Sequence, residues 1–172
     1  IPLRLVGSEM CIRDSFKKYA ENKDMLIFDA GCGTGLVGKE LKKFGYNNFY
    51  GADLSKTLLD TIPKGLYKKL DKIDLNEPIK TNDNYYDAVM CVGTFTYAHV
   101  KPNALEEFVR ITKNKGLICF TINEGIYEEY GFDKKIKELK DKNKWKEIVF
   151  FKSDYIASKD VNAWLGLYEV IK

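Results

Sequence analysis

The chain has 172 residues, of which 45% are hydrophobic and 31% charged, and its formal net charge is only +3. This length suits a single domain with one sizeable core. Because basic and acidic residues nearly balance, the composition argues against a nucleic-acid-binding protein, and no apolar run reaches the roughly 18 residues that a transmembrane helix needs.

Residues 1–15 differ from the rest of the chain. They begin without methionine, show no clear amphipathic period and contain too short an apolar stretch for a signal peptide. They resemble translated adapter sequence, so we interpret residues 1–15 as a non-native leader and residues 16–172 as the single domain. Before the first predicted strand, residues 15–23 can form little more than two helical turns.

The most informative segment is DAGCGTG at residues 29–35, which follows an apolar run. A strand at 25–30 that ends in alternating glycines, followed by a helix at 36–44, predicts a sharp strand–turn–helix unit. Gly31, Gly33 and Gly35 leave this turn almost without side chains, so its backbone can approach a ligand closely. In a parallel α/β sheet, ligands bind at this end of the first strand.

The spacing of the turn restricts the kind of ligand. A dinucleotide-binding turn has the pattern G-x-G-x-x-G, whereas this one is G-x-G-x-G, and no Gly-Lys-Ser/Thr follows as a P-loop requires. Asp29, directly before the turn, would repel a pyrophosphate and suits a ligand with a positively charged amino group. Asp53 ends the next predicted strand, 22 positions after Gly31, where an acid can accept hydrogen bonds from ribose hydroxyls.

A third acid, Asp74, follows the third predicted strand. It can accept from an exocyclic adenine amine while Leu75 lies near the ring, although Asp71 competes for this role. Three acids at the ends of three successive strands therefore suit a ligand with an amine, a ribose and an adenine.

Strands and helices are predicted to alternate through the rest of the chain. Further strands are predicted at 48–53, within 67–73, and at 88–92, 117–122, 145–151 and 164–171. Further helices are predicted at 56–62 with Ser55 as N-cap, at 102–113 opened by Pro102, and at 130–142, where Ile136 and Leu139 share one face. Loops are predicted around Pro78 and at 81–84, and a turn at 114–116.

This order predicts an α/β fold: a doubly wound, mostly parallel, seven-stranded Rossmann-like sheet with a C-terminal antiparallel hairpin. Four cysteines without paired spacing and a single histidine argue against a disulfide framework and against a metal site. Cys32, Cys91 and Cys119 fall in or beside apolar strands, as buried reduced thiols do, which indicates a cytoplasmic protein or, alternatively, a nuclear one. The oligomeric state stays open.

Five segments carry a resemblance to class I S-adenosylmethionine-dependent methyltransferases. They are DAGCGTG (29–35), FYGADLS (49–55), KIDL (72–75), YYDAVMCVGTFTYAHV (85–100) and KGLICFTIN (115–123). Within that superfamily, GTGLVGKELKKFG, CVGTFTYAHV and GFDKKIKELKDKNKW resemble the methyltransferase-like proteins of the Williams–Beuren region. The resemblance implies methyl transfer from S-adenosylmethionine to a small-molecule or protein acceptor, with nucleic acid the least expected.

Combined with the acids above, the resemblance gives a set of expected cofactor-binding residues. They are Asp29, Gly31, Cys32, Gly33, Thr34, Gly35, Asp53, Leu54, Asp74, Leu75, Val92 and Gly93. Methyltransferases of this kind carry one or two helices before the first strand that help to cover the cofactor. We therefore expect residues 16–172 to lack part of this N-terminal lid.

The acceptor is expected at the loop after the fourth strand, residues 93–100. Thr94, Phe95 and Tyr97 are the candidate acceptor-pocket residues, with the alternative that Phe95 and Tyr97 belong to the core. Methyl transfer mainly requires positioning, and a base helps only if the acceptor must lose a proton. His99 is the candidate base, with the alternative that it caps the next helix or packs beside Pro102.

Two other functional classes remain as alternatives. One is a nicotinamide-dependent reductase, although Tyr97 and Lys101 follow a strand and do not lie on a long helix as a catalytic Tyr-x-x-x-Lys pair does. The other is a non-catalytic binding protein with a methyltransferase fold.

Overall fold

The computed structural model describes residues 8–97, 100–156 and 161–172. The strands of this part are β1 (Ile27–Ala30), β2 (Phe49–Asp53), β3 (Lys69–Lys72), β4 (Tyr86–Phe95), β5 (Thr112–Asn123), β6 (Trp145–Ile156) and β7 (Val161–Val170). The helices are α1 (Ser8–Tyr19), α2 (Leu36–Lys43), α3 (Lys56–Leu59), α4 (Ala104–Ile111), α5 (Glu124–Tyr127) and α6 (Phe132–Asp141).

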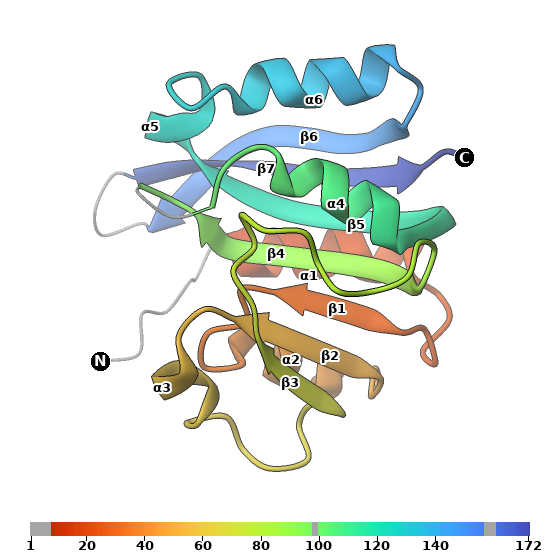
Figure 1. The fold of residues 1–172 in the computed structure, drawn as a ribbon, viewed down its shortest axis with the longest axis vertical. Coiled ribbons are helices and arrows are strands. Elements are labelled where there is room, and N and C mark those ends of the chain that lie inside the picture. Colours follow the sequence, from red (N-terminus) through yellow and green to blue (C-terminus); the bar gives the residue numbers. More distant parts are fainter. Residues whose placement is uncertain (1–7, 98–99, 157–160) are drawn as a thin grey trace.

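The strands form one sheet in the order β3-β2-β1-β4-β5-β7-β6 (Figure 1). Strands β1 to β5 pair in parallel, and β7 runs antiparallel to both β5 and β6. The predicted doubly wound, mostly parallel sheet with a C-terminal antiparallel hairpin is confirmed. The strand order reverses between β1 and β4, and this reversal opens a crevice at the carboxyl ends of these strands.

Helices cover both faces of the sheet and create two apolar layers. In Figure 1, α4 and α6 lie in front of the sheet and α1 and α2 lie behind it. Successive residues of β1 point to opposite faces, so Phe28 packs in the layer with Phe108 of α4, and Ile27 packs in the layer with Leu41 of α2. The central strands are therefore buried on both sides, as expected for parallel strands.

Several element boundaries differ from those predicted. The fourth strand, expected at 88–92, runs from Tyr86 to Phe95, because its pairing with β5 resumes after a register shift beyond Cys91. The turn expected at 114–116 lies inside β5, where Lys115 has a positive φ of 62° and the pairing with β4 is interrupted. Both β4 and β5 therefore extend beyond their apolar runs, because their backbone hydrogen bonds continue into the flanking polar residues.

The helix starts are only partly as predicted. Ser55 is the N-cap of α3, and its side chain accepts a hydrogen bond from the Leu58 backbone N–H at 3.3 Å, as expected. Pro102 does not open the next helix, which begins at Ala104 after the N-cap Asn103. The amphipathic helix around Ile136 and Leu139 is confirmed as α6, and both side chains are buried.

A helix crosses the predicted domain boundary at residue 16. Helix α1 begins at Ser8, whereas only two helical turns from residue 15 onward were expected. The ring of Phe16 is fully buried 5.6 Å from that of Tyr46, and the Tyr46 hydroxyl donates to the Ala20 carbonyl. Because helices extend cooperatively, this anchored second half supports the turns that precede it. The boundary itself stays a prediction.

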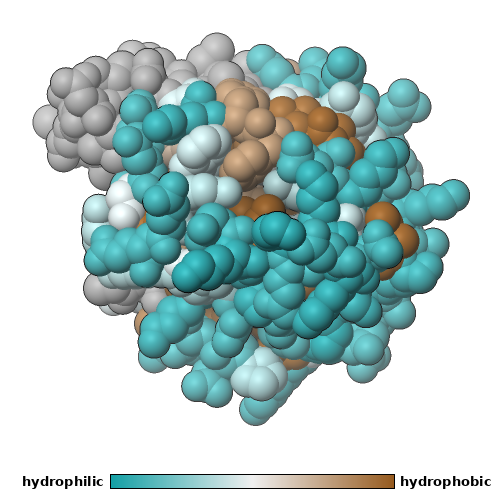
Figure 2. All heavy atoms as spheres, turned by 90° about the horizontal axis from the view of Figure 1, so that it is seen from above, coloured by the Kyte–Doolittle hydropathy of each residue, from teal (hydrophilic) through white to brown (hydrophobic). Residues whose placement is uncertain are grey.

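The lysine-rich surface of α6 is exposed to solvent, as Lys134, Lys137 and Lys140 show. Viewed from above, the molecular surface is mainly hydrophilic with small apolar patches (Figure 2). Among helices in the described ranges, none combines the length and apolar character that a membrane-spanning segment requires.

Candidate functional site

A hollow of about 490 Å³ lies at the carboxyl ends of β1, β2 and β4. Its volume falls in the range of small-molecule sites, and its place at the reversal of strand order is where open α/β sheets bind ligands. The residues that line it are Gly31, Gly33, Asp53, Leu54, Ser55, Leu58, Ile73, Asp74, Leu75, Asn76, Gly93, Thr94, Thr96 and Val100.

The three glycines of the turn have different roles. All three have positive φ, at 76° for Gly31, 52° for Gly33 and 84° for Gly35. A Cβ on Gly31 would lie 2.1 Å from Oγ1 of Thr94, whereas a Cβ on Gly33 would meet no protein atom within 4 Å. Gly31 is therefore required by packing, Gly33 leaves space at the pocket, and Gly35 is the left-handed N-cap of α2.

Asp53 connects the glycine turn to the end of β2. Its Oδ2 accepts from the Gly33 N–H at 2.9 Å, and its Oδ1 accepts from the Ser55 N–H at 2.8 Å. These two bonds fix the orientation of a carboxylate that lines the hollow. An ionised carboxylate offers about four acceptor positions, so it can accept further hydrogen bonds from a ligand.

Asp29 does not line the hollow. Its side chain is buried at 2% exposure beneath the glycine turn, where Oδ2 accepts from the Tyr67 hydroxyl at 2.5 Å and Oδ1 has no partner. Burial raises the pKa of this carboxyl to about 7, against the lowering effect of the Tyr67 hydrogen bond. The structure thus pairs Asp29 with Tyr67, whereas the sequence suggested a direct contact with a ligand amine.

Asp74 lies in the hollow beside the buried side chain of Leu75. Its Oδ1 accepts from the Asn76 N–H at 2.9 Å, which shapes the turn after β3. The competing acid, Asp71, lies on β3 outside this hollow and pairs with Lys69 at 2.7 Å. The tertiary structure therefore separates two acids that are only three positions apart.

The region after the fourth strand differs from its expected form. Gly93, Thr94 and Phe95 belong to β4 and not to the following loop, although Gly93 and Thr94 do line the hollow. Phe95 is a core residue with its ring 4.8 Å from that of Phe132, so the core alternative holds for this side chain. Tyr97 is 54% exposed and does not line the hollow.

Other expected site residues lie outside the lining. Cys32 and Val92 are buried, and neither Thr34 nor Gly35 contributes to the hollow. His99 lies outside the described residues. Leu54, by contrast, lies at the rim with 59% of its surface exposed.

Four lining residues were not predicted from the sequence. They are Ser55, Leu58, Ile73 and Asn76, whereas Thr96 and Val100 fall within the expected acceptor loop at 93–100. Each lies within four positions of a predicted site residue, so a wider window around each strand end would have included them. Which neighbours turn inward depends on the local backbone after each strand, and their residue types do not reveal it.

A profile of the methyltransferase domain matches residues 28–120, from β1 into β5. The fold and this match define the class: the chain belongs to the methyltransferase domain family. Human Methyltransferase-like protein 27 is 39% identical over 98 residues, which cover 56% of this chain and 40% of that protein. The uncharacterized protein MJ0638 of Methanocaldococcus jannaschii is 37% identical over 123 residues, which cover 70% of this chain and 52% of that protein.

The chain thus spans about half the length, or less, of these two relatives. Among solved structures, magnesium protoporphyrin IX methyltransferase of Synechocystis PCC 6803, with bound SAM, has a TM-score of 0.70 at 14% identity. That alignment covers 94% of this chain and 79% of the other. At this identity, the likeness concerns the fold alone.

Proposed function

We propose that the protein binds S-adenosylmethionine in the hollow at the carboxyl ends of β1, β2 and β4, and transfers its methyl group to a small-molecule or protein acceptor. The observation that carries this proposal is the convergence of Gly33, Asp53 and Asp74 on one hollow. Membership of the methyltransferase domain family supports it.

The lining residues fit the cofactor in their chemistry. Asp53, fixed by two backbone N–H groups, would accept hydrogen bonds from the ribose hydroxyls. Asp74 would accept from the adenine amine while Leu75 contacts the ring. Gly33 leaves space for the methionine part. Asp29, paired with Tyr67 beneath the turn, would support the turn from below.

When bound, S-adenosylmethionine supplies an electrophilic methyl group on a sulfonium centre. Gly93 and Thr94 line the end of the hollow formed by β4, so the acceptor would approach there. The protein would mainly align the acceptor atom and exclude water. If the acceptor must lose a proton, His99 is the proposed base.

The finer assignments are also part of the proposal. The three long strings at 33–45, 91–100 and 131–145 favour a relative of the methyltransferase-like proteins of the Williams–Beuren region. Residues 16–172 would form the methyltransferase domain. Nucleic acid is the least expected acceptor in this proposal, because the net charge is only +3.

Calorimetric titration with S-adenosylhomocysteine tests the cofactor site. Asp53→Ala removes the ribose acceptors, so we expect the Kd to rise about 10- to 100-fold. Asp71→Ala removes a neighbouring carboxylate outside the hollow and should leave the Kd within about twofold of the parent. Equal affinity of Asp53→Ala and the parent would place the site elsewhere.

A pair of glycine variants separates ligand contact from loss of fold. Gly33→Ala and Gly45→Ala place a methyl group at positive φ, 52° and 89°, in both cases without a protein atom within 4 Å. Both should therefore lose similar stability, about 1 kcal/mol. Only Gly33→Ala should abolish S-adenosylhomocysteine binding. If both variants bind normally, the glycine turn does not contact the cofactor.

The same titration distinguishes the alternative functions. A folded protein that binds neither S-adenosylhomocysteine nor a nicotinamide cofactor would favour a fold retained for partner binding. Saturable binding of NADH alone would favour a reductase.

A further inference from the structure

A second hollow, of about 640 Å³, lies on the sheet face that carries α4 and α6, but over β2 and β3. No helix crosses the front of these two strands in Figure 1, and the segment between β3 and β4 passes the carboxyl end of β2 before it runs in front of β4. The hollow is lined by Phe28, Tyr50, Gly51, Lys69, Asp71, Lys72, Ile73, Ile79, Lys80, Thr81, Asn82, Tyr85 and Tyr86. The proposed methyl transfer uses none of these residues except Ile73.

Aromatic rings form one wall of this hollow. The rings of Phe28 and Tyr86 stack at 4.9 Å, and Tyr85 meets Tyr86 edge to face at 5.0 Å. The Tyr50 ring lies 6.4 Å from that of Tyr85. Phe28 and Tyr86 are buried, whereas Tyr85 keeps 40% of its surface exposed. A planar ligand can therefore stack on an aromatic surface that the core holds rigid.

The charge of the lining favours an anion. Lys69, Lys72 and Lys80 contribute three positive charges against the single carboxylate of Asp71. Asp71 pairs with Lys69 at 2.7 Å, and neither Lys72 nor Lys80 has a carboxylate partner among the described residues. Two ammonium groups are thus available to a ligand beside the aromatic wall.

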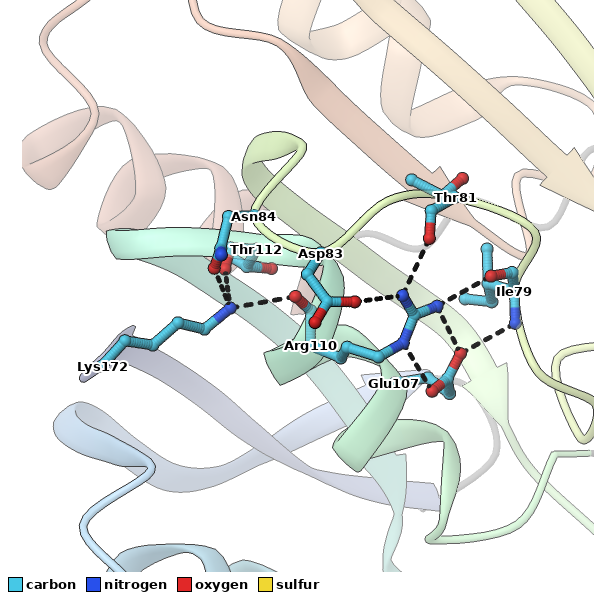
Figure 3. A network of polar contacts seen from close by, with 8 residues as sticks. All are labelled: Ile79, Thr81, Asp83, Asn84, Glu107, Arg110, Thr112 and Lys172. Atoms are coloured by element: carbon cyan, nitrogen blue, oxygen red, sulfur yellow. Dashed lines mark hydrogen bonds and ion pairs between the residues drawn. The ribbon is translucent and has the colours of Figure 1, made fainter.

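Arg110 of α4 holds the opposite wall in place (Figure 3). Its guanidinium donates to the carbonyl oxygens of Ile79 at 2.7 Å and Thr81 at 2.8 Å. It also donates to the carboxylates of Asp83 at 2.7 Å and Glu107 at 2.8 Å, and Glu107 accepts from the Ile79 N–H. A segment without helix or strand is thereby fixed, so the hollow is preorganised and its binding requires little ordering.

From these observations we propose that this aromatic and lysine-lined hollow is a second binding site, for a small planar aromatic anion such as a nucleoside monophosphate. The base would stack on the Tyr85 ring, with the Tyr50 ring tilted by 46° beside it, and the phosphate would lie between Lys72 and Lys80. The limited extent of the hollow, and the low net charge of the chain, favour a single nucleotide unit over a strand of nucleic acid.

The site is separate from the proposed cofactor pocket. Ile73 is the one residue that lines both hollows, and the residues at the proposed methyl end, Gly93 and Thr94, line only the first. The proposal does not rest on methyl transfer. Its test includes Asp53→Ala, in which the second hollow is intact even if the cofactor pocket is lost.

The experiment is a calorimetric titration of the protein with guanosine 5′-monophosphate in the presence of saturating S-adenosylhomocysteine, repeated with Asp53→Ala. We expect a Kd below about 1 mM in both, and weaker binding of guanosine, which lacks the phosphate. Tyr85→Ala should weaken binding about tenfold, because it removes the stacking surface. Tyr85→Leu keeps apolar bulk and should lose affinity to the same extent. It serves as the test if Tyr85→Ala is poorly folded.

Tyr19 is 43% exposed on α1, so Tyr19→Ala is a matched control that should leave the affinity unchanged. Replacing Lys72 and Lys80 with Gln should remove most of the salt dependence of binding. Unaltered affinity in both Tyr85 variants, or displacement of the nucleotide by S-adenosylhomocysteine, would overturn the proposal. A single-stranded oligonucleotide that binds at least about tenfold tighter than the mononucleotide would also overturn it, in favour of nucleic acid.

Discussion

Asp29 and Asp53 both lie within the last two residues of their strands, yet the fold gives them opposite environments. Asp53 lines the hollow and accepts two backbone hydrogen bonds, whereas Asp29 is buried with one oxygen that has no partner. The sequence could place both acids at the end of the sheet where ligands bind. It could not distinguish them, because burial depends on Tyr67, which reaches Asp29 from 38 positions further along the chain.

Burial of Asp29 predicts a pH dependence of stability. Its folded-state pKa is raised to about 7 from an ordinary value of 3.8, so the folded protein binds the proton more tightly than the unfolded chain. The stabilisation from this proton is complete below about pH 4 and is lost as pH rises through 7, by at most about 1.4 kcal/mol per pH unit.

Urea denaturation at pH 5 and pH 8 measures this effect. Asp29→Asn should flatten the pH dependence between these values. Tyr67→Phe removes the hydrogen bond that lowers the pKa of Asp29, so it should move the loss of stability to higher pH. An unchanged slope in Asp29→Asn would assign the pH dependence to other groups.

At the scale of elements, the segment between β3 and β4 depends on a helix that follows it in sequence. Residues 73–85 contain no helix or strand, and Arg110 and Glu107 of α4 bind its backbone at Ile79 and Thr81. Arg110→Met should lower the free energy of unfolding by about 2–3 kcal/mol, because two partly buried carbonyl groups lose a charged donor. Hydrogen exchange should also accelerate at residues 79–83.

A second cationic side chain, that of Lys113 in β5, serves as the control. Lys113 pairs with Asp87 at 2.7 Å with 47% of its side chain exposed, so Lys113→Met should cost less than about 1 kcal/mol. Equal losses from the two variants would show that Arg110 contributes no more than an exposed ion pair.

The elements themselves were largely predictable from the sequence, whereas their ends were not. Apolar runs at the predicted strands and the Ser55 cap identified most elements, because these signals are local. The ends of β4 and β5 were not predictable, because they depend on which residues pair across the sheet. The same pairing places Phe95 in the core and Thr94 in the hollow.

At the scale of the whole molecule, the C-terminal hairpin is joined to the core by Trp145. Its buried ring stacks on Tyr168 at 4.3 Å and on Phe120 at 6.0 Å. Trp145→Ala should lower the free energy of unfolding by about 3–5 kcal/mol, because it leaves a large cavity between β6 and the central strands. Trp164→Ala removes the other tryptophan, which is only half-buried, and should cost clearly less.

Guanidinium denaturation followed by circular dichroism would measure both losses. A loss from Trp145→Ala no larger than that from Trp164→Ala would mean that the hairpin is held mainly by its backbone pairing with β5.

The sequence by itself determined the class of fold, the position of the glycine turn and one acid that lines the hollow, Asp53, because periodicity, glycine spacing and strand ends are local properties. Only the tertiary structure decided that Asp29 is buried against Tyr67, that Asp74 and not Asp71 lines the hollow, and that a second, lysine-lined hollow lies over β2 and β3. These features depend on contacts between segments far apart in the chain, and such contacts cannot be deduced from the local pattern of residue types.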